Sequence, residues 1–114
     1  MRFAYAGTAR FAELVLQGLA DAGSVPVALV TNPDRPRGRH GTPQPPPIKA
    51  RAQALGLPVL QPERLSDPDG MDALQAHTPQ VLVVCAYGQI VRQAVLDAVE
   101  TIVVHPSLVP RWRG

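Results

Sequence analysis

The sequence contains a single cysteine and a single lysine among its 114 residues. One cysteine, Cys85, excludes an intrachain disulfide and a metal centre built from cysteine thiolates. No stretch approaches the ~20 apolar residues of a membrane helix, and residues 1–7 are too short and interrupted for a secretory signal. We therefore expect a cytoplasmic protein without membrane contact.

A strong charge of one sign is also absent. The sequence has eleven basic and nine acidic residues, which gives a net charge of +2. That balance is too even to predict nucleic-acid binding from bulk charge. The hydrophobic content of 46% and the charged content of 18% are ordinary for a globular chain. The length suits one small domain whose core has little margin.

Proline is abundant but unevenly spread, with six of the 13 prolines lying between Pro33 and Pro47. Because proline lacks a backbone donor and restricts the residue before it, we predict an irregular loop over 33–47 without regular structure. Elsewhere short apolar runs alternate with helical spacing. Strands are expected at 3–6, 25–31, 58–60, 81–86 and 101–104. Helices are expected at 11–19, 48–55, 67–77 and 91–99.

This alternation predicts an α/β fold, with a parallel sheet and helices on both of its faces. In such sheets the ligand crevice lies at the carboxyl ends of the strands, where the strand order reverses. Four segments should meet there: residues 6–8, the loop after Thr31, residues 86–88, and His105 with the loop that follows it. The pattern thus predicts where a ligand or substrate would bind, but not which reaction takes place there.

Several residues near these strand ends have simple structural interpretations. The segment around Gly7 lacks the three-glycine spacing of a dinucleotide fingerprint, so nicotinamide or flavin binding has little support. We interpret Gly7 as a residue that allows a tight turn from strand to helix. Cys85 lies in an apolar strand and is expected to be a buried, inert thiol. No pair of histidines or cysteines has a metal-ligand spacing, so no metal is predicted.

Two loops carry residues suited to chemistry. Arg35, Arg37 and Arg39 lie on the proline-rich loop, where guanidinium groups suit contacts to phosphates. A solvated basic loop is an equally good interpretation of that charge. His105, at the end of a strand, can act as an acid, a base or a hydrogen-bond donor near neutral pH. A structural histidine is the alternative.

A family resemblance follows from five segments whose order and spacing agree across the chain: Ala6-Gly7-Thr8, Thr31 to Arg39, Pro58 to Pro62, Ala86-Tyr87-Gly88, and His105 to Gly114. Together they resemble methionyl-tRNA formyltransferases. The His-Pro-Ser-Leu-x-Pro loop from His105 is shared by the wider folate-dependent formyltransferase superfamily. The Pro-Asp-Arg-Pro-x-Gly-Arg loop from Pro33 is narrower and points to the tRNA branch.

The resemblance implies a Rossmann-like, doubly wound parallel sheet that is truncated at its C-terminal side. Residues 1–114 would form the N-terminal part of the catalytic domain, and the C-terminal tRNA-binding domain would be absent. The implied enzyme transfers a formyl group from 10-formyltetrahydrofolate to the amino group of methionine on the initiator tRNA, in translation initiation. Initiator methionyl-tRNA is therefore the expected partner, and we expect a monomer.

The resemblance also assigns roles to residues. His105 matches the family's catalytic histidine, which would stabilise the charge that develops on oxygen or shuttle a proton. Folate contacts are expected from Cys85, Ala86, Tyr87 and Gly88 and, in the loop after the histidine, from Ser107, Leu108 and Pro110. Contacts to tRNA are expected from Arg35, Arg37, Arg39 and Lys49, with Arg39 at the family's important basic position.

One position departs from the family pattern. The family's catalytic asparagine lies two residues before the histidine, and Val103 occupies that place here. Residues 103 and 105 of a strand face the same side, so Val103 is expected to point into the site without offering a hydrogen bond. Losing one such donor lowers a rate by about 10²–10³-fold.

Other functions therefore remain open at the level of the sequence. The family's catalytic aspartate lies beyond residue 114, so a non-catalytic folate-binding module and a truncated remnant are both alternatives. A 10-formyltetrahydrofolate hydrolase-like domain is a third, because it too has an aliphatic residue at the asparagine position. The Pro-Asp-Arg-Pro loop from Pro33 argues against the hydrolase.

Overall fold

The computed structural model describes residues 1–36 and 41–104, and its centre is a five-stranded sheet. The strands have the spatial order β5–β2–β1–β6–β7, and all four pairings are parallel. Their bounds are Phe3–Ala6 for β1, Leu29–Val30 for β2, Val59–Leu60 for β5, Val81–Cys85 for β6 and Glu100–Val104 for β7. The predicted α/β class with a parallel sheet is confirmed.

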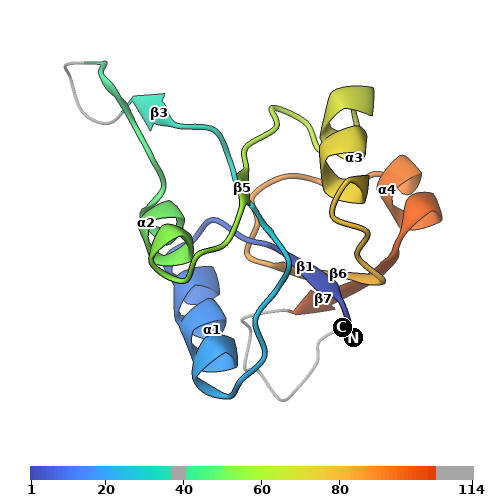
Figure 1. Ribbon diagram of the computed structural model, residues 1–114. Helices are drawn as coiled ribbons and strands as arrows, with labels where there is room; N and C mark the ends of the chain where they lie inside the picture. The colour runs from blue at the N-terminus through green and yellow to red at the C-terminus, as the bar shows by residue number, and fades with distance from the viewer. Residues whose placement is uncertain (37–40, 105–114) are drawn as a thin grey trace, which may run out of the picture.

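Four helices of the described residues cover the sheet, and the predicted cover on both faces is also confirmed. They are α1 (Arg10–Asp21), α2 (Pro47–Ala54), α3 (Pro68–Gln75) and α4 (Gln93–Ala98). Figure 1 shows α1 and α2 on one side of the sheet and α3 and α4 on the other. Side chains alternate between these layers, since Tyr5 and Cys85 pack with α1 and α2 whereas Ala6 and Val84 pack with α3 and α4.

The strand order fixes the position of the crevice. From β1 the chain moves outward through β2 to β5, then returns to place β6 on the opposite side of β1. The direction of winding therefore reverses between β1 and β6. In open parallel sheets the ligand crevice lies outside the carboxyl ends of the strands at such a switch point. Here those ends are Ala6 and Cys85.

An ion pair fastens α2 to α1 on one face of the sheet. Glu13 is 7% exposed, and its carboxylate accepts a hydrogen bond from Arg51 Nε at 3.0 Å. A second guanidinium nitrogen lies 2.9 Å from the same oxygen. Arg51 also donates to Gln17 Oε1 at 2.6 Å. Because α2 follows the proline-rich segment directly, this pair anchors one end of that segment.

The proline-rich segment contains regular structure, so the prediction of none over 33–47 was wrong. Strand β3 (Arg35–Pro36) pairs antiparallel with β4 (Pro43–Gln44). Each strand is two residues long and exposed, and proline is tolerated at such exposed edges. In Figure 1, β3 lies beyond α2, away from the main sheet.

Candidate functional site

Gly7 begins the site, directly after β1, and close packing explains why it is a glycine. A Cβ atom there would lie 2.6 Å from Ala12 Cβ and 2.7 Å from the Cys85 carbonyl oxygen. Gly7 is not among the residues with a positive φ. The close approach of β6 and α1, rather than an unusual backbone conformation, therefore requires the missing side chain. Its N–H donates to the Val30 carbonyl at 3.0 Å.

The Thr8 hydroxyl joins three of the segments expected at this edge. It donates to the Tyr87 carbonyl at 2.8 Å and accepts from the Asn32 N–H at 3.3 Å. The hydroxyl oxygen also lies 3.1 Å from Thr31 Oγ1. A hydroxyl has one hydrogen and a carbonyl can only accept, so Thr31 is the donor in the last bond. The predicted meeting of these three segments is confirmed.

Ala86 turns the chain out of β6 in an uncommon conformation. Its φ is 50°, in the left-handed region, which costs a non-glycine residue about 1–2 kcal/mol. The Ala86 carbonyl accepts from the N–H groups of Thr8 and Ala9, at 3.0 and 3.1 Å. This turn therefore ties the segment predicted to contact folate to the start of α1. Cys85, just before it, is fully buried, as predicted.

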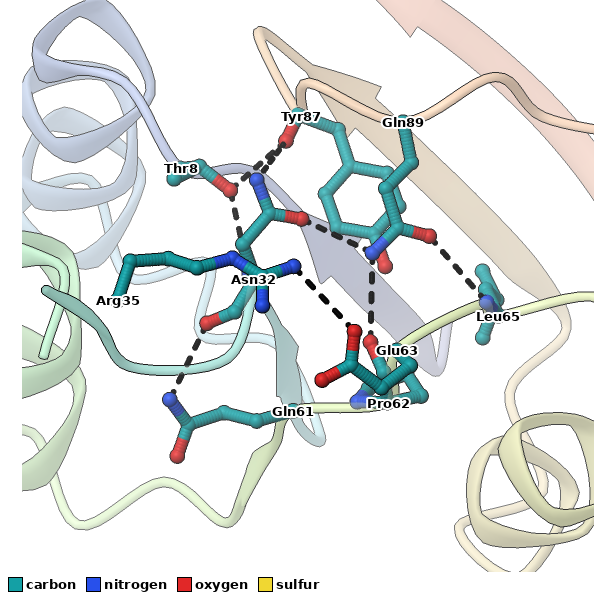
Figure 2. A network of polar contacts seen from close by, with 9 residues as sticks. All are labelled: Thr8, Asn32, Arg35, Gln61, Pro62, Glu63, Leu65, Tyr87 and Gln89. Atoms are coloured by element: carbon teal, nitrogen blue, oxygen red, sulfur yellow. Dashed lines mark hydrogen bonds and ion pairs between the residues drawn. The ribbon is translucent and has the colours of Figure 1, made fainter. Parts of the chain in front are cut away.

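Three neutral amide side chains, which the sequence did not single out, complete the network. Asn32 Nδ2 donates to the Tyr87 carbonyl at 3.3 Å, and Asn32 Oδ1 accepts from Gln89 Nε2 at 2.9 Å. Gln61 Nε2 donates to the Asn32 carbonyl at 3.1 Å. Figure 2 shows these side chains converging on Asn32. The amides follow three different strands, so they cross-link the loops at the carboxyl edge.

We call Thr8, Asn32, Tyr87 and Gln89 the crevice floor. Tyr87 is 2% exposed, and burial raises the pKa of its phenol above the ordinary value. The phenol is therefore neutral at physiological pH. Its oxygen has no hydrogen-bond partner among the residues that the structure describes. The floor contains no charged group, so it offers shape and hydrogen bonds rather than charge.

A charged rim lies beside the floor and consists of Asp34, Arg35, Lys49 and Glu63. Lys49 Nζ lies 3.6 Å from Asp34 Oδ1, and the same oxygen accepts from Gln61 Nε2 at 2.7 Å. Arg35 Nη2 lies 3.3 Å from Glu63 Oε1. Two of the four basic residues predicted to contact tRNA are thus paired with acids. The other two, Arg37 and Arg39, lie outside the described residues.

Residues of the floor line two hollows. The larger, of about 290 Å³, is lined by Glu63, Arg64, Ser66, Gly88, Gln89, Ile90 and Arg92. The smaller, of about 110 Å³, is lined by Thr8, Asn32, Pro33, Arg35, Gln44 and Pro46. The first lies between the loops after β5 and β6, and the second lies between the floor and the β3–β4 hairpin. The floor therefore separates two places where a ligand could lie.

The end of β7 carries the remaining site predictions. Val103 pairs with Val84, so both side chains lie on the face of the sheet covered by α3 and α4, and Val103 is 52% exposed. The role of Val103 in the site stays a prediction. His105 and the predicted folate contacts Ser107, Leu108 and Pro110 lie outside the described residues.

Neither a metal-binding cluster nor a membrane-spanning helix is found among the described residues. Across residues 1–36 and 41–104, no three or more His, Cys, Asp or Glu side chains gather closely enough to hold a metal ion. None of the described helices is both long and apolar enough to cross a membrane.

A family model described as formyl transferase matches residues 1–114, which is the entire chain. The chain belongs to the formyl transferase family. The chain is 47% identical over 116 aligned positions to a methionyl-tRNA formyltransferase of Chloroflexus aggregans. It is 48% identical over 115 positions to a methionyl-tRNA formyltransferase of Halorhodospira halophila. These alignments cover 100% and 99% of the chain but only 38% and 37% of the two relatives.

Solved structures of formyltransferases share the fold of this family member. Glycinamide ribonucleotide transformylase 1 from Geobacillus kaustophilus aligns with a TM-score of 0.64 at 21% identity, over 99% of this chain and 62% of that one. Phosphoribosylglycinamide formyltransferase from Bacillus halodurans gives 0.65 at 20% identity, over 100% and 60%. Identities this low establish the fold alone.

Proposed function

We propose that these residues contribute to an enzyme that transfers a formyl group from 10-formyltetrahydrofolate to the amino group of methionine on the initiator tRNA. One observation carries the proposal: 47–48% identity, over all or nearly all of the chain, to methionyl-tRNA formyltransferases. The chain spans little more than a third of those relatives. The proposal therefore concerns the donor and acceptor sites to which residues 1–114 contribute.

The larger hollow fits part of a folate donor. Ligand pockets commonly measure about 300–1,000 Å³, and this hollow of about 290 Å³ lies just below that range, as expected for a site that holds only part of the ligand. Arg64 and Arg92 line it, and guanidinium groups form strong hydrogen bonds with carboxylates such as those of a folate tail. Ile90 is 77% exposed there and offers apolar surface to a flat ring. The residues present thus suit an anionic ligand with an aromatic part.

The rim supports the proposed contact with tRNA. The Arg35 side chain is 59% exposed, and an exposed ion pair such as Arg35–Glu63 contributes ~0–1 kcal/mol. A phosphate can therefore replace Glu63 as the partner of Arg35. Lys49 is only 24% exposed and is held by Asp34 at the base of the hairpin. Of the four predicted tRNA contacts, Arg35 is thus the described residue best placed to meet a phosphate, and Arg37 and Arg39 follow it in the sequence.

The proposed catalytic group is His105, which follows β7 directly in the sequence. A hydrogen-bond donor placed where negative charge develops on the formyl oxygen lowers the barrier by about 3–4 kcal/mol. Val103 cannot supply such a donor. We therefore propose that the charge on the formyl oxygen is stabilised by His105 without help from position 103.

A chimera tests the acceptor. The matching segment of the Chloroflexus aggregans enzyme would be replaced by residues 1–114, and formylation of initiator methionyl-tRNA would be measured beside formylation of glycinamide ribonucleotide. We expect formylation of the tRNA only. A second chimera with Val103→Asn should be faster, because the side chain would regain a donor. Formylation of glycinamide ribonucleotide, or release of formate without a formylated product, would replace the proposal by a different transferase or by the hydrolase.

A further inference from the structure

We propose that Asn32 and Gln89 are positioning residues, whose paired amides hold residues 86–90 in the shape needed to bind the formyl donor. This inference rests on the proposed function, because it assumes that the hollow beside Gly88 and Ile90 takes a folate. It adds two residues that neither contribute a charge nor belong to the proposed catalytic group.

The amide pair connects three loops that lie far apart in the sequence. Asn32 follows β2, Gln89 follows β6, and Gln89 Nε2 donates to Asn32 Oδ1 at 2.9 Å. The same nitrogen lies 3.3 Å from the Pro62 carbonyl, and Gln89 Oε1 accepts from the Leu65 N–H at 3.3 Å. Pro62 and Leu65 belong to the loop after β5. Figure 2 shows Gln89 reaching across to both of these backbone groups.

Backbone groups fix the orientation of both amides. The Leu65 N–H can only donate and the Pro62 carbonyl can only accept, so the oxygen and nitrogen of Gln89 cannot exchange places. Gln89 therefore donates from Nε2 to Asn32, and Asn32 must accept that hydrogen bond through Oδ1. The other end of Asn32, Nδ2, is left facing the Tyr87 carbonyl, which can only accept. The pair therefore has one hydrogen-bonded arrangement, anchored at both ends.

Within the described ranges, Gly88 and Ile90 take part in none of the backbone hydrogen bonds that join the loops. Gly88 is exposed with a φ of 87°, in a region where glycine is unstrained, and Ile90 is 77% exposed. Gln89, between them, is half-buried and fastened by its amide. Asn32 Nδ2 also packs against Gly88, only 3.0 Å from where a Cβ would lie. The side of the hollow that Gly88 and Ile90 form is thus shaped through the amide pair.

The same amide is unavailable to the ligand as a donor. Both hydrogens of Gln89 Nε2 are used, one for Asn32 and one for Pro62. Gln89 therefore acts on binding by ordering its neighbours. When a binding-competent shape is populated in only a fraction of molecules, the apparent affinity falls by that fraction.

Calorimetric titration of the 114-residue chain with 5-formyltetrahydrofolate, a stable isomer of the donor, tests the idea. Gln89→Met keeps the length of the side chain and removes its amide, and Asn32→Ala removes the partner. We expect each variant to bind about tenfold more weakly. The double variant should bind about as weakly as either single one, because the pair acts as a unit. Gln93→Met, on the exposed face of α4, is the matched control and should bind like the wild type.

Hydrogen exchange of the Leu65 amide separates the possible results. Gln89→Met should speed that exchange because the acceptor of the Leu65 N–H is lost, while far-UV circular dichroism stays unchanged. Faster exchange with wild-type affinity would overturn the positioning role and leave the proposed function intact. An unchanged exchange rate of the Leu65 amide in Gln89→Met would show that Gln89 does not hold this loop, and would overturn the inference. A folded wild-type chain that does not bind would overturn the positioning role, because residues 86–90 would then not form a donor site in this chain. The proposed function would be unaffected by that result, since the chain spans little more than a third of its relatives, and the chimera tests it separately.

Discussion

The crevice floor and the rim lie side by side, yet they are held by different kinds of interaction. Neutral hydroxyl, amide and peptide groups join Thr8, Asn32, Tyr87 and Gln89. The rim is held by exposed or half-exposed ion pairs, such as Lys49–Asp34. Salt screens exposed charges, with a Debye length of about 10 Å at 0.1 M, but leaves neutral hydrogen bonds largely unaffected. The floor is therefore suited to recognising shape, and the rim to recognising charge.

The largest effect is expected at Gly7, which directly precedes Thr8 of the floor and is closely packed. Gly7→Ala places a Cβ within 2.7 Å of the Cys85 carbonyl and should lower the free energy of unfolding by about 3 kcal/mol. Gly18→Ala is the matched control, because that glycine lies inside α1 with open space around it. Alanine there should raise the free energy of unfolding by about 0.5–1 kcal/mol. Urea unfolding measures both, and equal effects at the two positions would contradict the close packing around Gly7.

Next in size is the ion pair that anchors the rim through α2. Arg51→Met leaves the buried Glu13 carboxylate without its partner and should lower the free energy of unfolding by about 2 kcal/mol. Arg10→Met removes a second cation near the same carboxylate, but Arg10 is 76% exposed and 3.9 Å away. Its loss should change stability by less than about 0.5 kcal/mol. If Arg10→Met were the more harmful change, Arg51 would not be the anchor of α2.

Removing the hydroxyl should affect stability differently at two buried tyrosines, by a difference of about 1 kcal/mol. Tyr5 Oη donates to the Ala12 carbonyl at 2.8 Å, so Tyr5→Phe should cost about 1 kcal/mol. Tyr87 Oη has no partner within the described part of the chain, so Tyr87→Phe should cost close to nothing at neutral pH. Thermal unfolding of the two variants compares them. A large loss on Tyr87→Phe would reveal a partner for that hydroxyl.

The same phenols predict loss of stability in alkali. Burial, and for Tyr5 also the neighbouring Cys85, raises the pKa of each phenol above the ordinary value of 10. Both stay neutral in the folded chain while the unfolded chain ionises, so stability is fully present below pH 10 and falls above it. The loss per phenol approaches about 1.4 kcal/mol per pH unit once the unfolded phenol is fully ionised. Between pH 10 and 11, where that ionisation is still incomplete, Tyr87→Phe should remove about 1 kcal/mol of the stability loss.

The smallest effect should fall on the rim. Asp34→Asn can keep the hydrogen bond from Gln61 but loses the charge that faces Lys49. We expect a loss of about 0.5 kcal/mol at low salt that disappears at about 1 M salt, where screening is short-ranged. Asp97→Asn, whose partner Gln93 is neutral and lies on the same helix, is the control. A loss that persists in high salt would show that the rim is held by something other than charge.

Much of the fold could be predicted because burial leaves a pattern in the sequence. The run from Val81 to Cys85 is apolar without alternation, as expected for a strand covered on both faces, and it forms β6, an interior strand between β1 and β7. The expected strand over 25–31 shortened to Leu29–Val30, although the Val27 N–H still donates to the Phe3 carbonyl at 2.8 Å. The length of β2 was harder to predict than its position. Two hydrogen-bonded residues are enough to form this strand because it lies between two other strands, β1 and β5.

The hairpin and the amide network could not be predicted for physical reasons. Rules for proline describe the interior of a sheet, and they fail for Pro36 and Pro43 because each lies in an exposed two-residue strand. Asn32 and Gln89 are 57 positions apart, and no periodicity relates them. The available signal was positional, since each lies within a few residues of the end of a predicted strand. Polar side chains at such positions meet only when the strand order brings their loops together.

The anchored direction of the floor's hydrogen bonds has an entropic consequence. Chains of hydroxyl and amide groups often have two arrangements of nearly equal energy, which differ by reversing every donor and acceptor. Here the Tyr87 carbonyl, which can only accept, ends the chain that runs from Thr31 through Thr8. The floor therefore populates one microstate. A ligand that binds above the floor therefore meets the same pattern of donors and acceptors in every molecule. Binding then loses no entropy by selecting one of two hydrogen-bond arrangements.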